Sequence, residues 1–222
     1  MASEIDICNL ALAHLGDKAT VSSISPPEGS AQATHCARFY PIARDVTLEA
    51  HEWGFATVRG NLALLTDTPP PGWLYAYAMP NDCRNIVDLI DPNVPCFNPL
   101  PERGLHWQDD VFNPEPVPYE LESRGVDGTG VIYTNLAGAQ IRYVRGITDT
   151  TKFSAQFVDA VAWLLAAYLA GPIIKGDTGM AVARQMQAGY TTSLSVARAN
   201  DANNRRRSVA QSQRQASWIS NR

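Results

Sequence analysis

The sequence predicts an α+β fold, namely a four-helix bundle with an inserted small antiparallel β subdomain and an extended basic C-terminal tail. Helical spacing of apolar residues runs from about residue 3 to 56 and returns from about residue 153 to 207. Between these stretches, short alternating segments are separated by proline and glycine, as is typical of strands. The expected divisions are residues 1–68 for the N-terminal helices, 69–150 for the β-rich subdomain with its long proline-rich loop, 151–204 for the C-terminal helices and 205–222 for the basic tail.

The N-terminal stretch predicts two helices. Ser3 can cap the first helix, Asp6 is an acid in its first turn, and apolar residues recur at helical spacing over residues 4–15. Ser30 can cap the second helix. Pro41 should kink or break that second helix near its middle, because proline removes one backbone hydrogen bond and clashes with the preceding turn.

The middle of the chain predicts short strands and one long loop. Trp53 and Phe55 follow the second helix and are expected to lock its end against the core. Three prolines at 69–71 then mark a stiff linker. Residues 92–118 are rich in proline and are expected to form an exposed loop that serves as a binding surface or a flexible arm. Strands are expected at residues 86–90, 119–123, 130–134 and 140–144.

The C-terminal stretch predicts two more helices. Apolar residues from 153 to 168 form a helical stripe, and the Gly-Pro pair at 171–172 should end that helix. Thr178 should open a fourth helix that can run on to Arg207. The side chains expected to make core or subunit contacts are Trp53, Phe55, Phe157, Leu164 and Tyr168.

Charge is unevenly distributed along the chain. The whole chain carries a formal charge of −4, but residues 198–222 hold six arginines and one acid, a local charge of +5 that leaves −9 on residues 1–197. An acidic body with a basic end indicates a tail that binds a protein or a nucleic acid, or else a solvated end. The longest apolar run, residues 160–174, falls short of the roughly 20 residues that a membrane span needs. No secretory leader is recognisable, so a soluble cytoplasmic protein is expected.

Motifs for catalysis or metal binding are not found in the sequence. His51-Glu52 lacks the second histidine of a zinc-protease motif, because Phe55 occupies that position. The glycines near residue 128 do not form a dinucleotide-binding loop, and no nucleophile elbow or phosphate-binding loop occurs. The four cysteines are interpreted as small buried hydrophobic residues, with disulfides or a metal site as alternatives; they are Cys8, Cys36, Cys83 and Cys96. The sequence therefore predicts no catalytic residue, cofactor or metal.

Several segments, in this order, resemble the head-to-tail adaptor proteins of tailed bacteriophages, and most closely the tail tubular protein A group of short-tailed phages. The resemblance covers about residues 5–175 and weakens after that. The segments that carry it are residues 5–12 (IDICNLAL) with Leu15-Gly16, residues 37–48 (ARFYPIARDVTL) with 53–56 (WGFA), residues 73–83 (WLYAYAMPNDC), and residues 141–144 (IRYV) followed by 153–170.

The resemblance implies a non-enzymatic ring component of the virion neck, made in the cytoplasm of the host bacterium. Such adaptors form a dodecameric ring beneath the portal protein, extend the DNA channel without sequence recognition or membrane contact, and receive the tail nozzle protein. The basic end is expected to dock on the portal through Arg198, Arg205, Arg206, Arg207, Val209, Arg214, Trp218 and Ile219.

Two alternative functions use other residues of the same chain. A receptor- or glycan-binding tail module would use the aromatic residues Trp73, Tyr75, Tyr77 and Trp107. A nucleic-acid binder would use the arginines of the tail, against which the acidic body argues.

Overall fold

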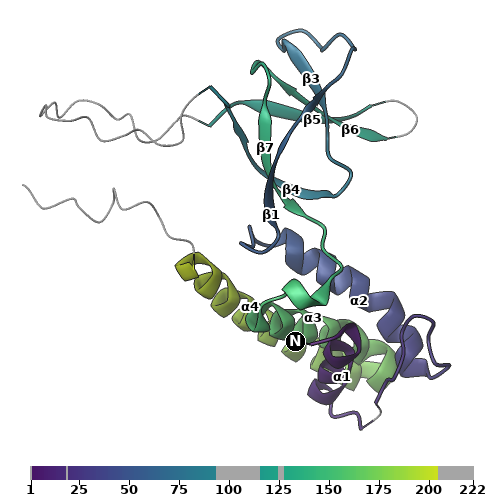
Figure 1. Cartoon of the computed structure of the whole chain (residues 1–222). Coiled ribbons are helices and arrows are strands. Elements are labelled where there is room, and N and C mark those ends of the chain that lie inside the picture. Colours follow the sequence, from purple (N-terminus) through teal and green to yellow (C-terminus); the bar gives the residue numbers. More distant parts are fainter. Residues whose placement is uncertain (1, 19, 94–115, 125–127, 205–222) are drawn as a thin grey trace, which may run out of the picture. The chain divides into compact units, whose positions relative to one another are not determined.

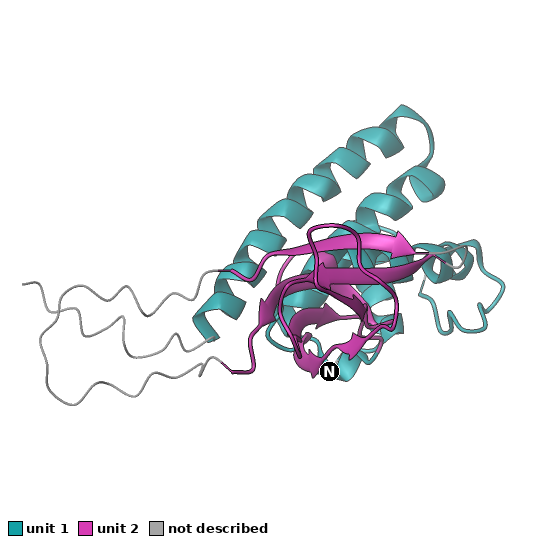
Figure 2. Cartoon of the chain, turned by 90° about the horizontal axis from the view of Figure 1, so that it is seen from above, with its two compact units in different colours: residues 1–47, 53–55, 149–222 teal, residues 48–52, 56–148 magenta. Residues whose placement is uncertain are grey.

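The structure is a computed structural model that describes residues 2–18, 20–93, 116–124 and 128–204 (Figure 1). The chain divides into two compact units (Figure 2). A helical unit comprises residues 1–47, 53–55 and 149–222, and a β unit comprises residues 48–52 and 56–148. The helices from the two ends of the chain therefore belong to one unit.

Helix boundaries follow serine caps. Ser3 forms a capping box with Asp6: the Asp6 amide donates to Ser3 Oγ at 3.1 Å, and the Ser3 amide donates to Asp6 Oδ2 at 2.8 Å. Ser30 Oγ accepts from the Ala33 amide at 3.1 Å, which confirms the second predicted cap. The helices in the described residues are α1 (Glu4–His14), α2 (Ala31–Glu49), the short 3-10 helix η1 (Thr150–Lys152), α3 (Ala155–Ile174) and α4 (Gly176–Asn204).

Helix α3 is the core of the helical unit, because both α1 and α4 pack along it. Its alanines allow this close approach, and its larger apolar side chains fill the space between the helices. The buried residues of α3 are Phe157, Ala160, Val161, Ala162, Leu164, Leu165, Ala166, Leu169 and Ala170.

Both helical prolines are tolerated without a break. Helix α2 continues through Pro41, and α3 continues through Pro172 to Ile174. The prediction that residues 171–172 end α3 is therefore wrong. Pro172 removes one backbone hydrogen bond, but only two residues of α3 follow it, so a kink there displaces little of the helix. The helix ends instead at Lys175, which has a φ of 61°.

Helix α3 is also long and apolar enough, by length and composition, to cross a membrane. The predicted interruption at Gly171 and Pro172 does not shorten it, because the helix extends over 20 residues. Half of its apolar window is buried within the chain, where α1 and α4 cover it. Helix α3 is therefore covered by two neighbouring helices, as expected of the central helix of a helical unit.

The β unit contains seven strands in its described residues, arranged in two antiparallel sheets (Figure 1). The three-stranded sheet has the order β1-β7-β4, and the four-stranded sheet has the order β2-β3-β6-β5. The strands are β1 (Thr57–Asn61), β2 (Ala63–Leu64), β3 (Tyr75–Ala78), β4 (Cys83–Ile90), β5 (Tyr119–Arg124), β6 (Thr129–Thr134) and β7 (Gln140–Arg145).

Both sheets contribute to one core in the β unit. Ile141 and Tyr143 of β7 alternate with Arg142, so that the apolar side chains face the core and the arginine lies on the other face. Tyr77 of β3 and Ile132 of β6 enter the same core from the second sheet. The four predicted strands lie within β4, β5, β6 and β7.

The predicted four-helix bundle with an inserted small antiparallel β subdomain is wrong. Among the described elements, α2 does not run closely along another helix, and it reaches α3 through long side chains such as Phe39 against Tyr168. The β region is not a small insertion, because it forms two sheets around its own core. The fold is α+β, with four α-helices and two antiparallel sheets in the described residues. The predicted basic tail, residues 205–222, lies outside them.

Candidate interaction surface

Four aromatic rings join the segment after α2 to α3. Five ring contacts, with centroids 4.8–6.0 Å apart, connect Trp53, Phe55, Phe153 and Phe157. The indole Nε1 of Trp53 donates to the carbonyl of Thr47 at 2.8 Å, which satisfies the polar atom of this buried ring. The cluster therefore holds the end of α2 within the helical unit.

The residues predicted as core or subunit contacts differ in accessibility. Trp53, Phe157 and Leu164 are buried inside the helical unit and present no surface to a partner. Phe55 and Tyr168 are only partly buried.

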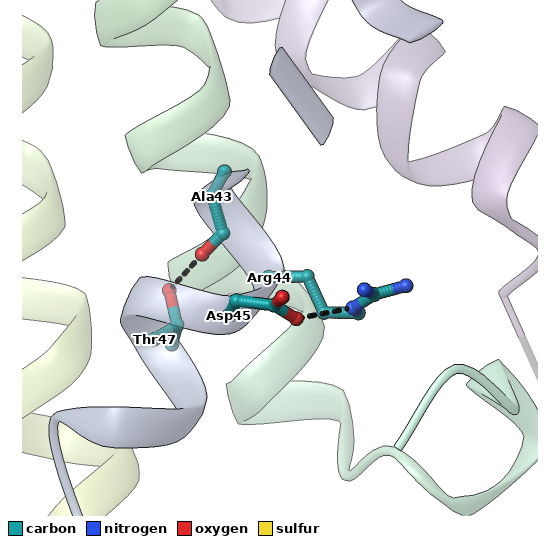
Figure 3. A network of polar contacts seen from close by, with 4 residues as sticks. All are labelled: Ala43, Arg44, Asp45 and Thr47. Carbon is teal, nitrogen blue, oxygen red and sulfur yellow. Dashed lines mark hydrogen bonds and ion pairs between the residues drawn. The ribbon is translucent and has the colours of Figure 1, made fainter. Parts of the chain in front are cut away.

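Helix α2 also carries a buried charge (Figure 3). The Arg44 side chain is 10% exposed, and its Nε donates to Asp45 Oδ1 at 2.9 Å. Its guanidinium lies 5.9 Å from the centre of the Tyr40 ring. Thr47 Oγ1 donates to the Ala43 carbonyl at 2.8 Å within the same helix. The carboxylate beside Arg44 offsets part of the cost of burying that charge.

A ring sandwich joins three helices of the helical unit. The imidazole of His14 stacks on Trp163 with centroids 4.1 Å apart. A Cβ added at Gly189 of α4 would lie 2.5 Å from the Trp163 ring, so only glycine leaves room for the indole there. Burial lowers the pKa of His14, and the nearby Asp159 carboxylate opposes that effect. Asp159 itself accepts a short hydrogen bond from the Ser193 hydroxyl.

In the β unit, the described aromatic residues of the proposed glycan surface serve internal contacts. Tyr77 is 2% exposed, and its hydroxyl donates to the Leu136 carbonyl at 2.9 Å and accepts from the Gly138 amide at 2.8 Å. Trp73 Nε1 donates to Glu120 Oε2 at 2.8 Å. Tyr75 is partly buried, and Trp107 lies outside the described residues.

The segment between β2 and β3 crosses the outer face of the four-stranded sheet. We call residues 66–73 the strap. Asp67 forms an ion pair with Arg124 at the far edge strand, β5, and Trp73 bonds to Glu120 on the same strand. Trp73 also packs on the small apolar cluster that contains Tyr133. The strap therefore covers apolar side chains on the face of the sheet that points away from the main core.

Acidic and basic side chains gather on the outer face of the three-stranded sheet. Arg142 lies 3.3 Å from Asp88 and 3.5 Å from Glu52, measured between nitrogen and oxygen atoms. Burial raises the pKa of Asp88, and Arg142 opposes the rise. Arg142, Asp88 and Glu52 form a partly buried polar network. On the core-facing side of the same strand, Tyr143 donates to Asp82 at 3.0 Å, and burial with this bond raises the pKa of Tyr143 to about 12.

Large apolar side chains remain exposed on both units. Ile42 and Val46 lie one turn apart on α2, so they share one face of that helix. Leu64 and Leu74, which lie just before and just after the strap in the chain, are 61% and 68% exposed. Among the described residues, the other exposed large apolar side chains are Leu10, Leu121, Met180 and Val196.

The basic end of the chain begins inside α4. Arg198 is exposed on that helix, whereas Arg205, Arg206, Arg207, Val209, Arg214, Trp218 and Ile219 lie outside the described residues, as does most of the predicted loop at 92–118. Asp201, the one acid of the basic end, accepts from the Gly54 amide at 2.9 Å. The sequence analysis missed this contact, because nothing in the local pattern relates two residues so far apart in the chain.

The described residues contain no group of three or more His, Cys, Asp or Glu side chains placed to hold a metal ion. In comparisons with known proteins, no family model and no curated protein matches the chain.

Proposed function

We propose that this protein is a structural head-to-tail adaptor of a tailed bacteriophage. In this proposal it forms a ring beneath the portal, extends the DNA channel and provides the docking platform for the tail nozzle. The observation that carries the proposal is the ordered resemblance over about residues 5–175. One of its segments, WGFA at residues 53–56, comes after α2, which ends at Glu49. The aromatic cluster of Trp53, Phe55 and Phe157 gives these residues a structural role that needs no catalytic chemistry.

Exposed apolar residues support assembly into a ring. A cyclic ring uses a head-to-tail interface, so each subunit needs two different complementary faces. The Ile42 and Val46 face belongs to the helical unit, and the Leu64 and Leu74 pair belongs to the β unit. Two separate apolar surfaces suit such an interface, because burying exposed apolar side chains favours association.

The charge distribution supports a channel through which DNA slides. Residues 1–197 carry a formal charge of −9, and acidic surfaces repel the phosphate backbone. An acidic channel lining would not bind the DNA duplex, because binding through counterion release requires basic side chains that neutralise the phosphates. The basic end of the chain would instead dock on carboxylates of the portal, with Trp218 and Ile219 as apolar anchors.

The glycan-binding alternative draws less support from the structure. Sugar rings stack on exposed aromatic faces, and Tyr77 is buried with a fully bonded hydroxyl. Trp73 packs on the sheet and bonds to Glu120. We therefore favour the adaptor.

The test combines the purified protein with the portal protein of the same phage. We expect a stoichiometric complex with a closed ring of this protein, visible by electron microscopy and native mass spectrometry. A chain that lacks residues 205–222 should keep its melting temperature and lose portal binding. A matched variant with Arg205, Arg206 and Arg207 changed to lysine should retain most of the binding if charge alone acts.

Two results would contradict the proposal. One is equal portal binding by the truncated and full-length chains at matched salt, which would reject the tail as the docking element. The other is that particles assembled without this protein retain their DNA and acquire tails, which would reject the adaptor role itself.

A further inference from the structure

Helix α2 carries a stripe of exposed side chains along one side. Pro41, Ile42 and Val46 form the apolar middle of this stripe, and Ile42 and Val46 are 49% and 39% exposed. Arg38 lies one turn before Ile42, and Glu49 is the last residue of the helix; both are exposed. Successive members are three or four residues apart, so all five lie on the same side of α2. We call these five residues the α2 stripe.

The charges at the two ends of the α2 stripe have no partner among the described residues. Arg38 and Glu49 form no ion pair there, whereas Arg44 of the same helix pairs with its neighbour Asp45. The stripe thus has an apolar middle with one unpaired charge of each sign at its ends. Such a surface is complementary to itself when two copies run antiparallel, because each positive end then meets a negative end.

The spacing of the α2 stripe fits a single antiparallel register. In a two-fold pair of helices, all pairs of residues that meet across the axis share one midpoint along the helix. The midpoint of Arg38 and Glu49 and the midpoint of Ile42 and Val46 both fall beside Arg44. One register therefore places Ile42 against Val46 of the second copy and Arg38 against its Glu49, and the axis repeats both contacts.

We propose that the α2 stripe binds the α2 stripe of a second copy of this chain, so that the free protein forms a two-fold dimer. The inference goes beyond the adaptor function and does not depend on it. The apolar middle favours association by leaving water, and the charges at its ends set the direction of the two helices. One side of a single helix is smaller than the roughly 800 Å² per partner of a stable interface, so the dimer is weak and depends on concentration.

In the adaptor proposal, this dimer has a consequence for assembly. A two-fold interface is closed, because both copies use the same face, whereas a ring requires two different faces on each subunit. The dimer covers the face of Ile42 and Val46, which is one of the two apolar surfaces that ring formation would use. Free copies would therefore be kept from polymerising before they meet the portal.

The first experiment measures the mass of the full-length chain by sedimentation velocity over a range of concentrations. We expect an equilibrium between monomer and dimer. Ile42→Ser should raise the dissociation constant about tenfold or more, because the two-fold axis repeats the loss of apolar contact. Met180→Ser on α4 is the matched control, since Met180 is also an exposed apolar residue of a helix, and it should leave the equilibrium unchanged.

Charge reversal tests the partner and the direction of the helices. Arg38→Glu alone and Glu49→Arg alone each bring like charges together at both ends of the interface, and each should weaken the dimer about tenfold. An equimolar mixture of these two variants should associate with the affinity of the wild type, because each end contact then joins a glutamate to an arginine. Arg184→Glu, at an exposed position of α4, makes the same change in charge and should have no effect.

Three results would overturn the proposal. If the chain remains monomeric up to about 1 mM, or if Ile42→Ser leaves the dimer intact, the α2 stripe does not bind a second copy. If the mixture of Arg38→Glu and Glu49→Arg associates no better than either variant alone, the two-fold antiparallel arrangement is wrong. If Ile42→Ser abolishes binding to the portal protein and leaves self-association unchanged, the stripe is a contact for another protein.

Discussion

The helical unit and the β unit are stabilised in different ways. In the helical unit, α1 and α4 approach α3 closely, and the ring of Trp163 fits against Gly189. In the β unit, the outer faces of the sheets carry ion pairs, among them Arg142 with Asp88 and Arg124 with Asp67. These pairs are partly exposed, and exposed pairs contribute little to stability. The comparison indicates that the helical unit is sensitive to changes in side-chain volume, whereas the surface of the β unit tolerates substitution.

The largest expected effect is the loss of a central ring in the helical unit. Phe157→Ala removes a fully buried side chain that contacts Trp53, Phe55 and Phe153, and it should lower the free energy of unfolding by about 3–5 kcal/mol. Chemical denaturation measures the loss. Hydrogen exchange should show faster exchange in α3 while the amides of β7 keep their protection.

The matched control is a partly buried ring of the same type. Phe39→Ala, on α2, should cost clearly less than Phe157→Ala because Phe39 already contacts solvent. If both substitutions cost the same, the helical unit does not depend on the aromatic cluster. If β7 loses protection together with α3, the two units do not unfold separately.

The next effect concerns added volume where two helices meet. Gly189→Ala places a Cβ 2.5 Å from the Trp163 ring, and such overpacking should cost about 1–3 kcal/mol. Gly60→Ala in β1 is the control for an added Cβ, because a Cβ there meets nothing within 4 Å. That control should be neutral or stabilise the protein by about 0.5–1 kcal/mol. Thermal unfolding tests this prediction: if the melting temperatures of both variants moved in the same direction, overpacking against Trp163 would not explain the effect of Gly189→Ala.

Periodicity predicted the helices and four strands because those features depend on local sequence. For this reason the sequence predicted the helix caps at Ser3 and Ser30 and the apolar face of α3 that contains Leu164. The strand β1 was missed, since Val58 is its one large apolar residue. The pairing of β7 between β1 and β4 was also not predictable, because sheet order depends on contacts between distant segments.

The contacts at the candidate surface were harder to predict than the helices. The need for glycine at position 189 becomes clear only when Trp163 is seen against it. The hydrogen bond from the Gly54 amide to Asp201 likewise joins two segments of the helical unit that are far apart in the sequence. In both cases the sequence shows the residue itself, but only the three-dimensional packing shows which distant residue it contacts.

A smaller effect is expected for the strap of the β unit. Asp67→Asn removes an ion pair whose two side chains are 45% and 41% exposed, and it should cost less than about 1 kcal/mol. Tyr77→Phe is the contrasting variant within the same unit. It leaves the Leu136 carbonyl and the Gly138 amide without their hydroxyl partner and should cost about 1–3 kcal/mol. Urea titrations that rank the two variants in the opposite order would reject the view that the sheet surface tolerates substitution.

The smallest expected effect is a pH dependence of the helical unit. His14 stacks on Trp163, its Nε2 is buried without a hydrogen-bond partner among the described residues, and burial lowers its pKa. In the unfolded chain the imidazole titrates near its ordinary pKa of about 6.5, so the unfolded state binds the proton more readily. The stabilising contribution of neutral His14 is therefore complete above that value and is lost as pH falls through the lower pKa of the folded protein.

The measurement is the melting temperature at a series of pH values between about 7.5 and 5.5, the range in which an ordinary histidine changes its charge. His14→Phe keeps an aromatic ring against Trp163 but cannot titrate, so its melting temperature should fall less steeply as pH decreases. The Asp159 carboxylate opposes the lowering of the His14 pKa, so Asp159→Asn should make the decline steeper when His14 is present and leave it unchanged in the His14→Phe background. Identical pH profiles for the wild type and His14→Phe would show that this imidazole does not limit the stability of the helical unit.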